Sequence, residues 1–216
     1  MIAPSLLAAN KEKLADEIKL VDSLHAEYLH WDIMDGKFVA TPVALTSEQL
    51  KKHARIHSMV NDVHIMVADP LNVSQEFIKA GANIVTFHIE ATHYDEKETL
   101  EVIDKIHELE CAAGISIKPC SSVGDIEKYL DKVELVLVMS VEPGKGGQKF
   151  MPEALSKIAE LKRIRDEKGL KFLIEVDGGI NGETGQECLE AGCDILVAGS
   201  YLFGHDDIKE RMETLR

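Results

Sequence analysis

Residues 28–36, YLHWDIMDG, have the composition of a buried strand but carry a histidine and two aspartates. Burying an unpaired carboxylate costs several kcal/mol or more, so a buried Asp32 needs a compensating partner. Side chains two positions apart on a strand share a face, which places His30, Asp32 and Met34 on the same side. This stretch therefore predicts a strand with one chemically active face.

Runs of this kind recur along the whole chain and alternate with helical patterns. The eight runs are residues 2–8, 27–34, 60–67, 83–90, 112–118, 135–140, 171–177 and 194–199. Amphipathic stretches between them include 10–25, 70–81, 94–110 and 152–169, and Gly81 stands where a glycine would end the second. The runs lack strict polar alternation, which indicates a parallel sheet covered by helices. Eight strand–helix units in 216 residues predict an α/β fold, a closed (β/α)₈ TIM barrel.

Composition limits the domain count and the partners. No Pro/Gly/Ser-rich linker divides the chain, so we expect a single domain over residues 1–216. The net charge is −14, from 38 acidic and 24 basic residues. A chain this acidic repels nucleic acid and anionic membranes, so we expect neither as a partner.

Two further features indicate a cytoplasmic protein. No run approaches 18 consecutive apolar residues, and the first ten residues lack a basic leader, so we expect neither a membrane span nor a signal peptide. The four cysteines lack CxxC spacing and are interpreted as reduced structural thiols (Cys111, Cys120, Cys188 and Cys193).

Polar residues gather on the inner faces of three predicted strands. His30 and Asp32 come from the second, His64 from the third and Asp177 from the seventh. The carboxyl ends of barrel strands form the catalytic rim, so these four side chains are expected to converge. Two imidazoles and two carboxylates suit one divalent ion per subunit, which could be zinc, iron, manganese or cobalt. Alternatively, each of the four is an ordinary core or capping residue.

The two carboxylates indicate a reaction. Asp32 and Asp177 approach the barrel axis from different sides, so one could act as base and the other as acid on opposite faces of a flat intermediate. That geometry suits epimerisation beside a ketone, with the metal stabilising an enediolate.

Glycine-rich turns follow the last three strands. They are PGKGGQ (143–148), DGG (177–179) and AGS (198–200), which contain Gly144, Gly146, Gly147, Gly178, Gly179, Gly199 and Ser200. Backbone N–H groups in such turns can approach a phosphate closely, although each turn alone could be ordinary turn chemistry. Met34, Met66 and Met139 end three strands, either as core packing or as an apolar ceiling over the intermediate.

The remaining polar candidates receive minor roles. Asp35, beside Gly36, is interpreted as a turn residue. His88 could point inward with a supporting polar role, but we do not expect it to be a ligand. The other histidines are expected at the surface or at helix ends (His25, His53, His57, His93, His107 and His205).

Taken in order, IAPSLLAAN, HWDIMDGKFV, DVHIMV, MSVEPGKGGQKF, IEVDGGI and LVAGSYLFG resemble the successive motifs of the ribulose-5-phosphate 3-epimerase family. The resemblance implies interconversion of D-ribulose 5-phosphate and D-xylulose 5-phosphate through a metal-stabilised 2,3-enediolate, in the pentose phosphate pathway, by a homo-oligomer. It makes His30, Asp32, His64 and Asp177 the metal ligands and the two aspartates the acid and base. It further implies that Ser5 and His64 contact the substrate, that the three methionines line its site, and that Gly147, Gly179, Gly199 and Ser200 hold the phosphate.

Several positions depart from the family pattern. Ala8 and Asn10 replace serine and aspartate, Ala40 and Thr41 replace proline and asparagine, and Glu142 and Lys145 replace asparagine and phenylalanine. These changes leave the sugar open, because allulose-6-phosphate 3-epimerases use the same machinery. A lyase or aldolase and a non-catalytic sugar-phosphate binder are further alternatives. Lys145 is either a solvated loop residue or a contact to the phosphate or a distal hydroxyl.

Overall fold

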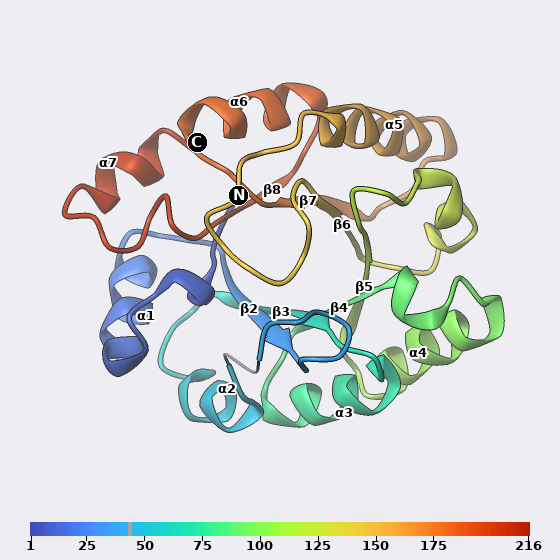
Figure 1. Cartoon of the computed structure of the whole chain (residues 1–216), viewed down its shortest axis with the longest axis horizontal. Helices are drawn as coiled ribbons and strands as arrows, with labels where there is room; N and C mark the ends of the chain where they lie inside the picture. The colour runs from blue at the N-terminus through green and yellow to red at the C-terminus, as the bar shows by residue number, and fades with distance from the viewer. Residues whose placement is uncertain (43–44) are drawn as a thin grey trace.

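Eight parallel strands form one sheet in the computed structural model, which describes residues 1–42 and 45–216. The strands are β1 (Ile2–Pro4), β2 (Tyr28–Met34), β3 (Val60–Met66), β4 (Ile84–His88), β5 (Ala112–Ile117), β6 (Leu135–Met139), β7 (Leu173–Asp177) and β8 (Ile195–Ala198). Each strand pairs with the next along the chain from β2 to β8, and β8 pairs with β1. A parallel bridge between Ser5 and His30 brings the two edges together. The predicted barrel is confirmed (Figure 1).

Helices surround the strands on the outside (Figure 1). They are α1 (Leu14–Ser23), α2 (Ser47–His53), α3 (Pro70–Ala80), α4 (Glu96–Glu108), α5 (Glu153–Lys168), α6 (Gly182–Ala191) and α7 (Ile208–Glu213). Local sequence explains their ends. In α3, the Asp69 side chain accepts the N–H of Asn72, Pro70 occupies the first turn, and Gly81 ends the helix at φ 115° as expected.

Two segments differ from the predicted pattern. The predicted strand 2–8 stops at Pro4, because the Ser5 side chain caps a 3₁₀ turn, η1 (Leu6–Ala8), by accepting the N–H of Leu7. The connection from β5 to β6 consists of two short 3₁₀ turns, η4 (Val123–Asp125) and η5 (Glu127–Tyr129), in place of an α-helix. A capping box between Ser122 and Asp125 favours the tight turn there.

The barrel interior contains both apolar and polar side chains. Apolar side chains of β1, β6 and β8, among them Leu135, Leu137 and Ile195, form one cluster. The interior also holds fully buried polar residues: His30, Asp62, His64, Thr86, His88, Ser116 and Glu175. Interiors of this kind require hydrogen-bonded or coordinated polar groups, which directs attention to the ends of β2, β3, β4 and β7.

Among the residues that the structure describes, none of the helices has the length and apolar character that a membrane span requires.

Candidate active site

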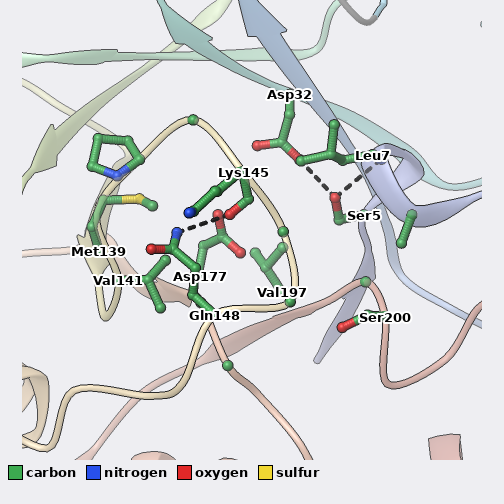
Figure 2. A pocket seen from close by; sticks show the side chains of 18 of the residues that line it. Ser5, Leu7, Asp32, Met139, Val141, Lys145, Gln148, Asp177, Val197 and Ser200 are labelled. Atoms are coloured by element: carbon green, nitrogen blue, oxygen red, sulfur yellow. Dashed lines mark hydrogen bonds between the residues drawn. The ribbon is translucent and has the colours of Figure 1, made fainter. Parts of the chain in front are cut away.

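A cavity of ≈ 500 Å³ opens at the carboxyl ends of the strands. Its lining includes thirteen residues predicted from the sequence: Ser5, Asp32, Met34, Met66, Met139, Gly144, Gly146, Gly147, Asp177, Gly178, Gly179, Gly199 and Ser200. Figure 2 shows Asp32 and Ser5 on one side of this cavity and Asp177 and Met139 on the other. The cavity's size suits a small ligand.

Four predicted ligands meet at the cavity floor. One ligand atom from each of His30, Asp32, His64 and Asp177 lies within 4.8 Å of the others. Asp32 Oδ1 is 3.4 Å from His30 Nε2 and 3.2 Å from His64 Nδ1. The strand register explains this, because Asp32 lies opposite His64 on the neighbouring strand.

This cluster fits a divalent metal ion. Within the described part of the chain, His30 Nε2 is buried and has no hydrogen-bond partner, although it faces Asp32. A buried ring nitrogen without a partner is costly, and coordination would satisfy it. Two imidazole nitrogens and two carboxylates match the donors that zinc, iron and manganese accept.

Asp32 and Asp177 have opposite electrostatic environments. Burial alone would raise the pKa of Asp32, but His30 and His64 outweigh it by charge and hydrogen bonding and hold that pKa below its usual range. The Ser5 hydroxyl also donates to Asp32 Oδ2 at 2.6 Å. Burial, followed by the negative charge of Asp32, raises the pKa of Asp177 to about 6. Asp177 therefore retains its proton to a higher pH than Asp32 does, which suits the pair to act as base and acid.

A second acidic group lies beneath the floor. His30 Nδ1 forms a hydrogen bond with Asp62 Oδ2, and this leaves Nε2 directed to Asp32. Burial, and then the charge of Asp62, raises the pKa of Glu175 well above its usual value. Neither carboxyl oxygen of Glu175 has a hydrogen-bond partner among residues 1–42 and 45–216. Burial and the neighbouring charge of Asp62 therefore favour the protonated form of Glu175.

The other histidine of the cluster also has a partner behind it. His64 Nε2 is 2.8 Å from His88 Nε2, and His88 Nδ1 is 3.1 Å from Glu90 Oε2. Glu90 Oε1 accepts the N–H of Lys118 at 2.8 Å and a hydrogen bond from the Ser121 hydroxyl. Burial favours neutral His88, and its pKa falls to about 4.

The glycine turns make a wall of backbone around the upper cavity. Gly144, Gly147, Gly178 and Gly179 all have positive φ. The Gln148 side chain donates to the carbonyl oxygens of Glu142 and Lys145, at 2.6 and 2.9 Å, and so shapes the loop after β6. Figure 2 shows the bond to Lys145. Backbone in this conformation can offer several N–H groups to an anion.

Comparison with known proteins identifies the family. The chain matches the model of the ribulose-phosphate 3 epimerase family over residues 1–203. This chain belongs to that family. It is therefore an enzyme of the isomerase class, an epimerase that acts on carbohydrates.

Full-length relatives support the assignment. Ribulose-phosphate 3-epimerase of Bacillus subtilis (strain 168) is 40% identical, over 100% of this chain and 97% of the relative. Ribulose-5-phosphate-3-epimerase, chloroplastic, of Arabidopsis thaliana is 37% identical, over 100% of this chain and 76% of its own. Among solved structures, a mutant tryptophan synthase alpha-subunit from Pyrococcus furiosus superimposes with a TM-score of 0.73 at 16% identity, covering 99% of this chain and 96% of that one. The last similarity concerns the barrel fold alone.

Two of the predicted metal ligands do not line the cavity. His30 and His64 are completely buried beneath it, so Asp32 and Asp177 are the members of the cluster that line the cavity. The three methionines, all nearly buried, do line it. Asp35 is a turn residue whose carboxylate accepts the N–H groups of Lys37 and Phe38.

The sequence analysis did not identify Glu90 or Gln148 as site residues of this family member. Strand alternation directs His88 inward, as expected, but Glu90 belongs to the 3₁₀ turn η3 (Ile89–Thr92) after β4. Its contacts with Lys118 and Ser121 join segments far apart in the chain. Local sequence carries no signal for such pairing. Gln148 belongs to the stretch PGKGGQ, which the sequence analysis singled out for its glycines. Its hydrogen bonds to the carbonyl groups of the loop become visible only in the folded conformation.

Proposed function

We propose that this chain interconverts D-ribulose 5-phosphate and D-xylulose 5-phosphate by proton transfer at C3 between Asp32 and Asp177. One observation supports the proposal above all others. Two carboxylates from different strands, with pKa values shifted in opposite directions, lie together at the floor of a cavity walled by glycine turns. Family membership is consistent with this reaction.

His30, Asp32, His64 and Asp177 would hold one divalent ion, and their nitrogen and oxygen donors suit zinc, iron, manganese or cobalt. When bound, the ion would supply Lewis-acid stabilisation of the negative charge that develops on the substrate oxygens.

The residues of the chain account for the proton movements. Ionised Asp32, oriented by the Ser5 hydroxyl, accepts the C3 proton, and protonated Asp177 donates one to the opposite face. The two aspartates exchange roles in the reverse direction. Met34, Met66 and Met139 exclude water from the reacting carbon, and backbone N–H groups near Gly179 and Gly199 bind the phosphate.

The two-aspartate mechanism is tested by solvent deuterium. Metal-reconstituted protein in D₂O should epimerise ribulose 5-phosphate and incorporate deuterium at C3. Asp32→Asn and Asp177→Asn should each lower epimerisation by about 10²–10⁴-fold. Each variant should still exchange the C3 hydrogen of one sugar, because the remaining aspartate can remove and return a proton on its own face. The two variants should retain exchange with opposite epimers.

Asp206→Asn is the matched control, because Asp206 is an exposed aspartate away from the cavity, and it should leave both epimerisation and exchange unchanged. Exchange of the same epimer in both site variants would contradict the two-face mechanism.

A second candidate substrate is allulose 6-phosphate. Four positions that depart from the family pattern line the cavity, namely Ala8, Thr41, Glu142 and Lys145. Changes in the wall affect the length and polarity of the sugar that fits, and the acid–base pair remains. Measurement of kcat/KM for both sugar phosphates distinguishes the two, since specificity is the ratio of these values.

The lyase and the non-catalytic binder lose support, because both aspartates occupy the cavity floor and the chain is a family member. Location in the cytoplasm, assembly into a homo-oligomer and organisation of residues 1–216 as one domain stay predictions from the sequence.

A further inference from the structure

His64 has each ring nitrogen occupied by a different neighbour. Nδ1 lies 3.2 Å from Asp32 Oδ1, inside the four-residue cluster, and Nε2 lies 2.8 Å from His88 Nε2. Both histidines are completely buried, so water does not substitute for either contact. Between the two facing nitrogens one must carry the proton and the other must accept it. Which one donates decides whether His64 Nδ1 carries a lone pair.

Glu90 determines the direction of this contact. Its Oε1 accepts the backbone N–H of Lys118 at 2.8 Å and the hydroxyl of Ser121, and its Oε2 is 3.1 Å from His88 Nδ1. A backbone N–H can only donate, which holds the Glu90 carboxylate in place as an acceptor. His88 must then donate from Nδ1, and its Nε2 is left as the acceptor. His64 therefore donates from Nε2, and its Nδ1 lone pair faces Asp32.

The number of N–H protons on the two imidazoles is consistent with a metal ion bound where this chain of contacts ends, at Asp32 and His64. Three contacts link Asp32, His64, His88 and Glu90, but two neutral imidazoles supply only two N–H groups. The contacts between His64 and His88 and between His88 and Glu90 use both. An ion held by the cluster of His30, Asp32, His64 and Asp177 would make a third proton between Asp32 and His64 unnecessary.

We propose that His88 and Glu90 are positioning residues that hold His64 in the tautomer required for metal binding through Nδ1. The inference rests on the proposed metal-dependent function. It adds Glu90, in η3 after β4, to the set of residues that determine metal affinity. Partners of this kind orient ligating histidines, and their loss commonly lowers metal affinity by about 10–100-fold.

Glu90→Gln is the decisive variant because it keeps the shape of the side chain but replaces the acceptor that faces His88 with a donor. The amide oxygen of the glutamine is retained by the Lys118 N–H, so its NH₂ group faces His88 Nδ1. His88 must then donate from Nε2 toward His64, where it meets the Nε2 proton of the metal-ready tautomer. The Zn²⁺ dissociation constant, measured by competition with a chromophoric chelator, should increase by about 10–100-fold.

Two control variants separate this effect from general damage. Glu98→Gln makes the same change in a similar pair, because Glu98 Oε2 lies 3.2 Å from His93 Nδ1, but both side chains of that pair are exposed. Ser121→Ala removes one donor to Glu90 and leaves its acceptor toward His88 intact. Neither should change Zn²⁺ affinity. An equal loss in Ser121→Ala and Glu90→Gln would overturn the inference in favour of loop anchoring.

The wild-type protein tests the tautomer directly, independently of whether a variant folds. In ¹⁵N-labelled, Zn²⁺-loaded protein, long-range ¹H–¹⁵N correlation should show His64 protonated at Nε2 and His88 protonated at Nδ1. Protonation of His88 at Nε2, or unchanged affinity in Glu90→Gln, would overturn the inference while leaving the proposed function intact. Failure of the wild-type protein to bind one Zn²⁺ at the cluster would overturn both.

Discussion

At the scale of single residues, position in the barrel determines what each carboxylate does. Asp32 lies between two histidines, which lower its pKa, while burial raises the pKa values of Asp177 and Glu175 on β7. Glu175 is completely buried, and the negative charge of Asp62 acts on it. The same functional group thus has different chemistry over a few ångströms, because desolvation and neighbouring charge differ at each site.

Glu175 should make the metal-free protein less stable as the pH rises. Its ordinary pKa is 4.5, and its folded pKa is raised, so above pH 4.5 the unfolded chain releases a proton that the folded chain retains. Glu175→Gln removes this penalty. Between pH 5 and the raised folded pKa, the variant should gain stability over wild type by up to about 1.4 kcal/mol per pH unit. Urea unfolding at several pH values measures the difference.

Glu187→Gln is the control for this series, because Glu187 is exposed on α6 and its substitution should give a difference that does not vary with pH. A Glu175→Gln difference that is equally flat would show that Glu175 is ionised in the folded protein.

At the scale of elements, the loops that follow the strands pack closely against one another. Gly179 joins β7 to α6, and its carbonyl accepts the hydroxyl of Thr184 in the first turn of that helix. It adopts φ 64°, and a Cβ there would overlap the backbone of Phe150. The loops after β6 and β7 therefore pack against each other through a position that only glycine fits.

Gly179→Ala should destabilise the protein and weaken phosphate binding. The left-handed backbone costs alanine about 1 kcal/mol, and the overlap with Phe150 adds about 1–3 kcal/mol of overpacking. Gly169→Ala is the matched control, because Gly169 has the same φ of 64° but nothing within 4 Å of the added Cβ. Gly169→Ala should therefore show only the backbone cost. Unfolding free energies and the inhibition constant of inorganic phosphate measure both effects, and equal losses in the two variants would contradict the packing argument.

At the scale of the whole molecule, the net negative charge of the protein repels the proposed anionic substrate. The chain carries a net charge of −14, and a sugar phosphate is an anion. Neutral backbone donors can still bind a phosphate, and Lys145 adds a positive group to the cavity lining. Long-range repulsion and local attraction respond to salt over different distances, so ionic strength can separate them.

Lys145→Gln should raise the KM for the sugar phosphate at low salt by up to about fivefold, because an exposed ion pair is worth up to about 1 kcal/mol. The difference from wild type should shrink as salt screens the charge. Lys149→Gln, at an exposed lysine of the same loop that does not line the cavity, should leave KM unchanged. Unchanged KM in Lys145→Gln at low and high salt would mean that Lys145 is a solvated loop residue.

Much of the fold could be predicted because it depends on local patterns. The period-two placement of His30 and Asp32, the apolar runs and the glycine turns are properties of short segments, and the structure has the barrel that they indicate. The β5–β6 connection was not anticipated in detail, because the tight turn near Asp125 depends on a capping contact. The cluster of four candidate ligands followed from strand alternation and the common rim of barrel strands.

The sequence by itself determined which residues face the barrel interior, since alternation along a strand is independent of the rest of the chain. Only the tertiary structure decided which of those residues meet and which are charged. The contact of Glu90 with Lys118 and Ser121, the approach of His88 to His64 and the closing bridge between Ser5 and His30 join segments distant in sequence. The opposite pKa shifts of Asp32 and Asp177 likewise arise from burial and neighbouring charges, which exist only once the strands are side by side.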